Sequence, residues 1–347
     1  MKIEVHLHAP ASDWGRRNSA GLVPDPSPYG LDQLPHEVSF QAPDAPTALS
    51  RLALRATGFD LATVVRPARP DTDVILCWDE VYGVPQLLGS RLRKGPPVAS
   101  GVIWLTDPAS SARAGRVVAR RLLSGADLIW ALSSAQLPVL ERHWGVPADR
   151  LAHLRFGVDT SFWRPGPEPA SQAHTPSFLV GSAGNDRHRD YRLLVTAMRS
   201  VRHQIPKARL EVATWQPLPD IPDLVQRRGT LSHTDLRDTL YRRAQVVAVV
   251  VRPNLHVSGI TTVLEAMACG RAVVCTRTPG IEDYVTENEN VILTRPGDQD
   301  DLTAALVALL LDDDRRHALA EAGRRHVSGL FTTSRMVKDL AGLLDRT

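Results

Sequence analysis

Short hydrophobic runs alternate with amphipathic stretches in the first half of the chain. The first few residues alternate toward a strand, and three apolar runs predict further strands: Asp73–Trp78, Val98–Leu105 and Asp127–Leu132. A helical pattern covers Ser110–Ser124, and Ser133 with Ser134 is typical of the N-cap of a helix that ends near Trp144. Because strands and helices alternate, we expect parallel βα units and an α/β domain.

The same alternation begins again in the second half. The predicted strands are Phe178–Val180, Arg209–Thr214, Gln245–Val251 and Ala272–Thr278. The predicted helices are Asp190–Gln204, Ser232–Ala244, Gly259–Ala268 and Thr332–Asp345, with two further long helices that meet at the acidic run Asp312–Asp314. This half is therefore a second α/β domain.

Prolines mark the organisation of the domains. Four of them punctuate a polar segment, at Pro165, Pro167, Pro169 and Pro176, and predict an interdomain linker. We expect a first domain at 1–165, a linker at 166–177, a second domain at 178–330 and a final helix at 331–347 that packs back on the first domain. Ala9–Pro35, rich in Gly, Pro, Ser and Asp, is expected to be one long loop that is either functional or mobile.

Composition excludes several classes of protein. A chain of 347 residues with 43% hydrophobic and 23% charged residues is neither disordered, fibrous nor a membrane-embedded bundle. A net charge of +3 does not indicate a nucleic-acid partner. Three cysteines without CxxC spacing, and no apolar run long enough to cross a bilayer, indicate a cytoplasmic protein that would meet a membrane only at its surface.

The common nucleotide-binding motifs are absent, but one segment stands out. The sequence has no P-loop, and Gly181 and Gly184 have the wrong spacing for a dinucleotide-binding turn. Arg252–Gly270 follows a buried strand, and a helix begins within it near Gly259. The unpaired N–H groups and the positive dipole end of such a helix start favour the binding of a phosphate. Glu265 lies further along that helix, where it could bind ribose hydroxyls or simply be a surface glutamate.

This segment and its neighbours resemble the retaining glycosyltransferases of family 4. The matching stretches are GTLSHTDLRDTLYRRA, EAMACG, AVVCT, GIEDYV with Gly280 and Asp283, NVILTRPGDQDDL and LLDDDRRHALAEAGRR. The resemblance is clear from about Asp127 to Phe331. It implies a GT-B fold, with two Rossmann-like parallel-sheet domains that face a central cleft. It also implies transfer of a sugar from a nucleotide-sugar donor with retention of configuration, without a metal or other cofactor.

The resemblance assigns the donor site to the second domain. Arg189 stands at the position of the family's phosphate-binding lysine, and Arg187 is the candidate to replace the family's missing arginine. The family's first motif glutamate falls on Val257, which leaves His256 and Ser258 as the nearest polar replacements. The full set of expected donor-binding residues is Gly181, His256, Ser258, Gly259, Ile260, Thr261, Thr262 and Glu265. A solvated basic helix start remains the alternative for the arginines.

The first domain is expected to bind the acceptor, which is a small-molecule natural product, an envelope lipid or a polysaccharide. Asp107 is the third catalytic candidate, beside Arg187 and Arg189. The acceptor candidates follow strands or lie in the long first loop: Trp14, Arg16, Arg17, Trp78, Asp79 and Glu80. Ordinary loop residues are the alternative for each of them.

Other interpretations of the same chain stay open. A GT-B sugar-nucleotide epimerase or hydrolase would need no acceptor, and a non-catalytic nucleotide-binding GT-B protein would not turn over at all. His6 and His8 have the spacing of a metal pair, but no second ligand cluster is evident in the sequence, so no metal site is predicted. Four arginines, Arg113, Arg116, Arg120 and Arg121, share one helical face, which is either solvated or a contact with anionic lipid.

Overall fold

The computed structural model describes residues 1–7, 11–41, 67–107, 113–166 and 178–347, together with 52, 54, 57–61 and 64. It divides the chain into two compact units. Unit 1 comprises Met1–Ser19, Pro26–Arg155 and Ser334–Thr347, and unit 2 comprises Ala20–Asp25 and Phe156–Thr333. His8, most of the expected linker and the first residues of the helix predicted at Ser110 lie outside the described residues.

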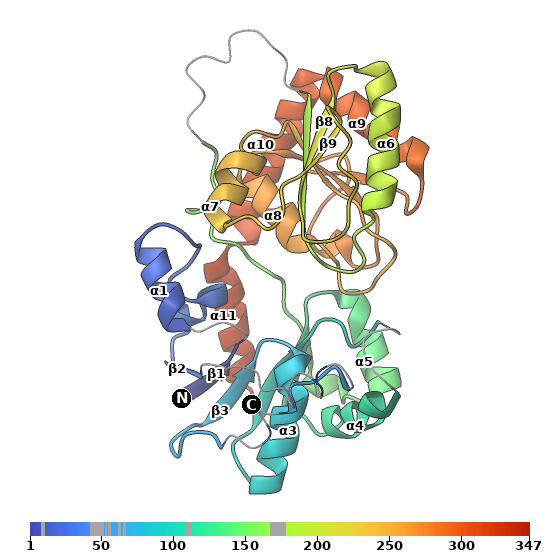
Figure 1. The fold of residues 1–347 in the computed structure, drawn as a ribbon. Helices are drawn as coiled ribbons and strands as arrows, with labels where there is room; N and C mark the ends of the chain where they lie inside the picture. Colours follow the sequence, from blue (N-terminus) through green and yellow to red (C-terminus); the bar gives the residue numbers. More distant parts are fainter. Residues whose placement is uncertain are drawn as a thin grey trace. The chain divides into compact units, whose positions relative to one another are not determined.

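Unit 1 is built on a six-stranded parallel sheet (Figure 1). Its strands are β1 (Lys2–His6), β2 (Glu37–Gln41), β3 (Val74–Cys77), β4 (Val98–Val102), β5 (Leu128–Ala131) and β6 (Leu151–His153). They lie in the order β2-β1-β3-β4-β5-β6, so the direction of the strand order reverses between β1 and β3. Ligands of open α/β sheets bind beyond the carboxyl ends of strands at such a switch point.

The helices of unit 1 are α1 (Ala11–Ser19), α3 (Glu80–Arg93), α4 (Arg113–Leu123), α5 (Leu137–Trp144) and α11 (Thr333–Leu344). Side chains of α3, α4 and α5 share one hydrophobic core with the strands, in which Leu87, Leu123 and Leu140 are buried. α11 groups with unit 1 from Ser334 onward.

The expectation of one long loop at Ala9–Pro35 was wrong, because the nine-residue helix α1 lies within it. Its sequence lacks an apolar period that would reveal a helix. Its charges instead suit the helix dipole, with Asp13 in the first turn and Arg16 and Arg17 in the last. Arg16 Nη2 also lies 3.2 Å from Asp13 Oδ1, one helical turn away.

Unit 2 is built on a second six-stranded parallel sheet. Its strands are β7 (Leu179–Ala183), β8 (Arg209–Ala213), β9 (Val225–Arg227), β10 (Val246–Val249), β11 (Ala272–Thr276) and β12 (Ile292–Thr294). Their order is β12-β11-β10-β7-β8-β9, which is the doubly wound order with its switch point between β7 and β10.

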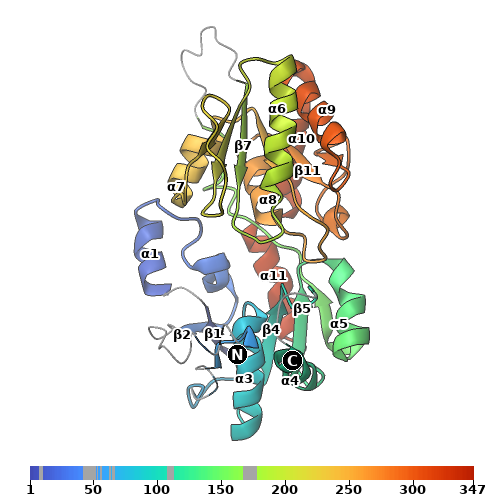
Figure 2. The ribbon, with the colours of Figure 1, turned by 45° about the vertical axis from the view of Figure 1, so that its right-hand side comes forward.

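Helices cover the sheet of unit 2. They are α6 (Tyr191–Gln204), α7 (His233–Asp235), α8 (Ile260–Ala268), α9 (Gln299–Leu311) and α10 (Asp313–Leu330), and a π-helical segment follows α7 at Leu236–Tyr241. α6 and α9 lie side by side along the sheet (Figures 1 and 2) and share a core cluster with it, in which Leu194, Val246 and Leu306 are fully buried. Of the helices described, none combines the length and the apolar character that a membrane span requires.

Candidate functional site

The best-formed site of the described chain lies at the switch point of unit 2. The segment at 184–190 follows β7 and leads into α6, and the segment at 250–259 follows β10 and leads into α8. Arg189 and Val251 form an antiparallel bridge between the two segments, and Asp190 N donates to Val250 O at 2.9 Å. The two loops are therefore joined directly at the carboxyl edge of the sheet.

Arg189 is the buried cation of this site, with 4% of its surface exposed. Its Nη2 donates to Thr262 Oγ1 at 2.9 Å, which directs the guanidinium to the first turn of α8. Two glycines leave room for it, since a Cβ atom at Gly184 or at Gly259 would collide with the guanidinium. Both glycines also have positive φ, 136° and 90°, which other residues rarely adopt.

The guanidinium of Arg189 is only partly satisfied. Its Nε and Nη1 atoms are buried without a hydrogen-bond partner among the described residues, and no ion pair to it is found in that part of the chain. A buried charge that lacks a partner is strongly unfavourable. The arrangement therefore suits an anionic ligand that would complete the hydrogen bonds.

The first turn of α8 supplies a second feature that favours an anion. α8 begins after Gly259, and no side chain caps this end of the helix. The first backbone N–H groups of a helix lack intrahelical acceptors and carry the positive end of its dipole. Thr262 Oγ1 lies in this turn and donates to Ala183 O at 3.2 Å, which holds the turn against the end of β7.

Glu265 lies further along α8 and is nearly buried, with 8% of its surface exposed. Its Oε2 accepts a hydrogen bond from Tyr241 Oη at 3.0 Å, at the end of the π-helical segment. Burial raises the pKa of Glu265 to about 8, although Tyr241 and the charge of Arg189 act to lower it. The carboxyl group can therefore either donate or accept near neutral pH.

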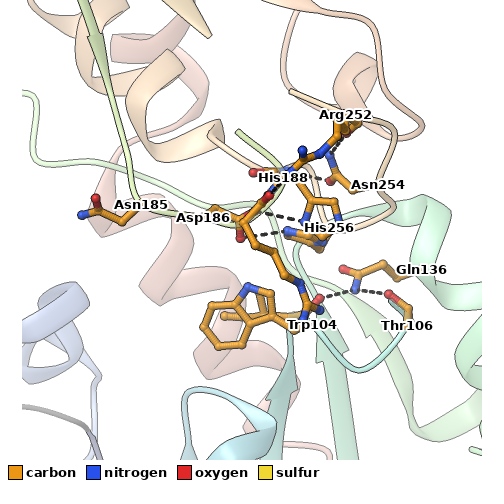
Figure 3. Close-up of polar contacts among 12 residues, drawn as sticks. Trp104, Thr106, Gln136, Asn185, Asp186, His188, Arg252, Asn254 and His256 are labelled. Carbon is orange, nitrogen blue, oxygen red and sulfur yellow. Dashed lines mark hydrogen bonds and ion pairs between the residues drawn. The ribbon is translucent and has the colours of Figure 1, made fainter. Parts of the chain in front are cut away.

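Asp186 joins two histidines from the two loops (Figure 3). Its Oδ1 lies 3.1 Å from His188 Nδ1, and its Oδ2 lies 3.2 Å from His256 Nε2. Donor atoms of the three side chains lie within 4.8 Å of one another, so they could hold a metal ion. The neighbouring Arg187, Arg189 and Arg252 make the surroundings positive, which disfavours a dication and suits an anion.

The loop before α8 holds its conformation through internal contacts. Asn254 Oδ1 accepts from Ser258 N at 2.9 Å, and Val257 O accepts from Ile260 N at 3.1 Å. His256 Nδ1 and Ser258 Oγ are buried without a partner among the described residues. Val257 occupies the position of the absent glutamate with φ 51°, and its side chain is buried.

The remaining donor-site candidates are more scattered. Arg187 is exposed, and its backbone carbonyl accepts from Arg252 Nη2. Thr261 is exposed on α8 and Ile260 is buried. Gly181 lies inside β7, where a Cβ atom would meet Ala244 Cβ at 3.0 Å, so its position is set by packing rather than by the sheet edge.

In unit 1, Trp78, Asp79 and Glu80 follow β3 at the switch point of that sheet. Trp78 is buried and stacks on Tyr29 with ring centroids 4.0 Å apart. Asp79 caps α3 by accepting from Val81 N at 2.9 Å. These contacts hold the unit together and leave little of Trp78 or Asp79 for an acceptor.

Glu80 has a role in the same framework. Its two oxygens accept from the backbone N–H groups of Ile103 and Trp104 at 2.8 and 2.7 Å. Burial and the charge of Asp79 raise the pKa of Glu80 to about 7, and these two hydrogen bonds act to lower it.

The other candidates of unit 1 lie on two separate segments, after β4 and on α1. Asp107 is half-buried, and its backbone N–H donates to Trp104 O at 2.9 Å. Next to it, Thr106 Oγ1 accepts from Gln136 Nε2 at 2.9 Å (Figure 3). Trp14, Arg16 and Arg17 all lie on α1, where the Arg17 guanidinium carbon is 6.0 Å from the Trp14 ring.

Sequence reasoning missed two parts of the unit 2 site. Asp186 was not selected because its partner His256 lies far along the chain and is brought to it only by the order of the strands. The second is the loop that carries Trp215, and a tryptophan directly after a predicted strand is a sequence signal for a residue at the carboxyl edge of the sheet. Trp215 is 62% exposed in the loop after β8.

Comparison with known proteins finds a family match over the segment that contains this site. Residues 177–312 match the family described as Glycosyl transferases group 1. This segment is similar to the group 1 glycosyltransferases. It contains β7 to β12 and the loops that form the site at the switch point of unit 2.

Two curated relatives are mannosyltransferases by name. The chain is 28% identical over 254 residues to the GDP-mannose-dependent alpha-(1-6)-phosphatidylinositol monomannoside mannosyltransferase of Mycobacterium tuberculosis, covering 66% of this chain and 64% of the relative. It is 31% identical over 218 residues to the GDP-mannose-dependent monoacylated alpha-(1-6)-phosphatidylinositol monomannoside mannosyltransferase of Corynebacterium glutamicum, covering 55% of each. The matched part of the chain thus spans less than two thirds of the length of these relatives.

Solved structures share the fold along the whole chain. HepE of Anabaena, solved with UDP and glucose, aligns with a TM-score of 0.75 at 16% identity and covers 100% of both chains. Sucrose-phosphate synthase of Thermosynechococcus elongatus aligns with a TM-score of 0.73 at 18% identity, covering 100% of this chain and 98% of the other. The two Rossmann-like units of this chain are therefore those of the GT-B fold.

Proposed function

We propose that this protein is a retaining glycosyltransferase that binds a nucleotide-sugar donor at the switch point of unit 2. The observation that carries the proposal is the buried guanidinium of Arg189, with two nitrogen atoms unsatisfied among the described residues, beside the uncapped start of α8. A diphosphate would supply the missing acceptors and the compensating charge.

The chemistry of sugar transfer explains why such a site would catalyse. As the bond between the sugar and the diphosphate breaks, negative charge builds on the departing diphosphate. Arg189 and the N–H groups at the start of α8 are fixed by packing, so they stabilise this charge without reorganising. No metal is required in this scheme, because the cation and the helix dipole act on the leaving group.

Glu265 is proposed to bind the ribose of the donor. Its Oε2 is engaged by Tyr241, and no hydrogen bond to its Oε1 is found among the described residues. A carboxyl oxygen at this depth can accept from a ribose hydroxyl. Family 4 membership and retention of configuration rest on the resemblance of the sequence motifs, and an NMR assignment of the anomeric proton of the product tests the latter.

The names of the curated relatives support a mannosyl donor and a lipid-linked acceptor, while a small-molecule acceptor remains the alternative. We place the protein in the cytoplasm, at the inner face of the membrane when the acceptor is a lipid. α4 supports contact with a membrane surface, because Val117 and Val118 are exposed beside the exposed Arg120 and Arg121. Co-sedimentation with vesicles of phosphatidylglycerol, compared with phosphatidylcholine alone, tests it.

The transfer itself is tested by a donor screen. UDP-glucose and GDP-mannose are incubated with the protein, with and without phosphatidylinositol-type lipid and small-molecule acceptors, and products are identified by mass spectrometry. A glycosylated acceptor is expected. Release of free sugar at the same rate with and without every acceptor would favour a hydrolase. Nucleotide binding without any turnover would favour a non-catalytic binding protein.

A further inference from the structure

Trp215 is an unusual surface residue in unit 2. Of its surface 62% is exposed, whereas Trp130, Trp144 and Trp163 are buried. It follows Thr214 directly after β8, the strand that neighbours β7 in the sheet. A large aromatic ring that is left in solvent at the carboxyl edge of a parallel sheet stands where ligands of such sheets bind.

The backbone of Trp215 is tied to the loop that leads to Arg189. Asn185 Oδ1 accepts from Trp215 N at 2.9 Å and from Thr214 Oγ1 at 3.0 Å. Gln216 Nε2 donates to Asn185 O and Asp186 O at 2.9 and 2.7 Å. Four hydrogen bonds thus hold Trp215 beside the segment that carries the phosphate-binding candidate.

The loop that carries Trp215 is also restrained on its other side. Pro217, Pro219 and Pro222 fix φ at three positions after it. Asp220 Oδ1 accepts from Arg227 N at 2.9 Å, which ties the loop to β9. The ring is therefore displayed on a restrained backbone rather than on a free loop.

We propose that Trp215 is the stacking platform for the nucleobase of the donor. The inference rests on the proposed function, since it requires the diphosphate to lie at Arg189. A nucleoside diphosphate anchored there has its base at one end, and Trp215 is the exposed aromatic ring joined to the same loop. Because every base has a π-face, such a platform binds pyrimidine and purine diphosphates alike.

Calorimetry with UDP, GDP and inorganic pyrophosphate separates this contact from the phosphate site. Trp215→Ala is expected to weaken UDP and GDP binding roughly 5- to 150-fold, the range of one lost base-aromatic stack, and to leave pyrophosphate binding unchanged. Trp215→Phe keeps an aromatic face and is expected to retain most of the affinity. Leu311→Ala removes another exposed apolar side chain of unit 2, 60% exposed, and is the matched control.

Fluorescence gives a second signature that a purely structural role would not produce. UDP is expected to quench the tryptophan emission of the wild type, and the quench is expected to disappear in Trp215→Phe while UDP still binds. Equal losses of UDP and pyrophosphate affinity in Trp215→Ala, or unchanged UDP affinity, would show that Trp215 does not stack on the base. Neither result would contradict the phosphate site at Arg189. If the wild type binds neither pyrophosphate nor either nucleotide, both the stacking role of Trp215 and the proposed function are wrong.

Discussion

Both sheets of this molecule have six parallel strands, but the residues at their switch points differ in chemistry. In unit 1 the residues that follow β3 are engaged by the protein itself, as Asp79 caps α3 and Trp78 stacks on Tyr29. In unit 2 the corresponding edge retains buried polar atoms without partners among the described residues, at Arg189, His256 and Ser258. The residues that follow β3 thus hold the framework of unit 1 together, whereas the loops after β7 and β10 keep buried polar groups that a ligand could satisfy.

The buried glutamates sharpen the same contrast. Glu80 accepts hydrogen bonds from two backbone N–H groups, whereas Glu265 accepts one hydrogen bond from a tyrosine hydroxyl. Burial raises the pKa of both carboxyl groups, to about 7 and about 8. The first carboxylate is thus part of the fold of unit 1, and the second retains hydrogen-bonding capacity for a ligand of unit 2.

The largest expected effect is on turnover when Arg189 is removed. Arg189→Ala should lower kcat with a verified donor and acceptor by about 10²–10³-fold, because a preorganised cation acts most strongly in the transition state. Arg189→Lys should recover part of the loss, since the charge remains and the bidentate geometry does not. The matched control is Arg192→Ala on the exposed face of α6. Steady-state kinetics that show Arg192→Ala to be the more damaging change would contradict the assignment.

Removing Glu80 should affect folding rather than binding. Glu80→Ala leaves the N–H groups of Ile103 and Trp104 without their acceptor, and the free energy of unfolding should fall by roughly 2–4 kcal/mol. Urea unfolding followed by circular dichroism measures this loss, with the exposed Glu141→Ala as the control. UDP and GDP affinities measured under native conditions should not change. If Glu80→Ala is as stable as the wild type, Glu80 has no structural role, and the proposed difference between the two sheet edges is wrong.

Removing Glu265 should affect nucleotide binding rather than folding. Glu265→Ala should weaken the binding of UDP and GDP by roughly 1–3 kcal/mol, which is the range for leaving polar groups unpaired. Calorimetry measures the effect, and the exposed Glu289→Ala serves as the control. Unchanged nucleotide affinity would remove the ribose assignment and leave Glu265 as a partner of Tyr241 alone.

The smallest effect is a change in how stability depends on pH. The folded state holds a proton on Glu265 up to about pH 8, whereas the ordinary pKa is 4.5. The stability that this proton contributes is fully present below pH 4.5 and is lost as pH rises toward about 8. Glu265→Gln should remove this slope, which is at most about 1.4 kcal/mol per pH unit. Parallel urea midpoints of the two proteins between pH 5 and pH 8 would show that the carboxyl group is ionised throughout.

Central strands were predictable from the sequence, and edge strands were not. The apolar runs at Asp73–Trp78 and Gln245–Val251 correspond to β3 and β10, which are buried on both faces and so read as continuous hydrophobic segments. The strands without a prediction are those at the sheet edges: β2, β6, β9 and β12. An edge strand such as Val225–Arg227 is short and largely exposed, so its sequence carries no such run.

The site was predictable only in part, for a related reason. Arg189 and the helix start at Gly259 could be found because motifs and a strand-to-helix boundary mark them. The contacts of Asp186 with His256 and of Asn185 with Trp215 depend on which strands are neighbours in the sheet. That order is a property of the folded unit and leaves no local pattern in the chain.

Val257 carries a consequence for the thermodynamics of ligand binding. A β-branched residue with φ 51° is in an unfavourable backbone conformation, of the kind that persists only where its surroundings enforce it. Its side chain is 1% exposed, so tertiary packing supplies that enforcement. The packing of the protein itself therefore holds the loop before α8 in this conformation. A ligand that binds there loses little free energy to conformational entropy, and more of the interaction energy is left for affinity.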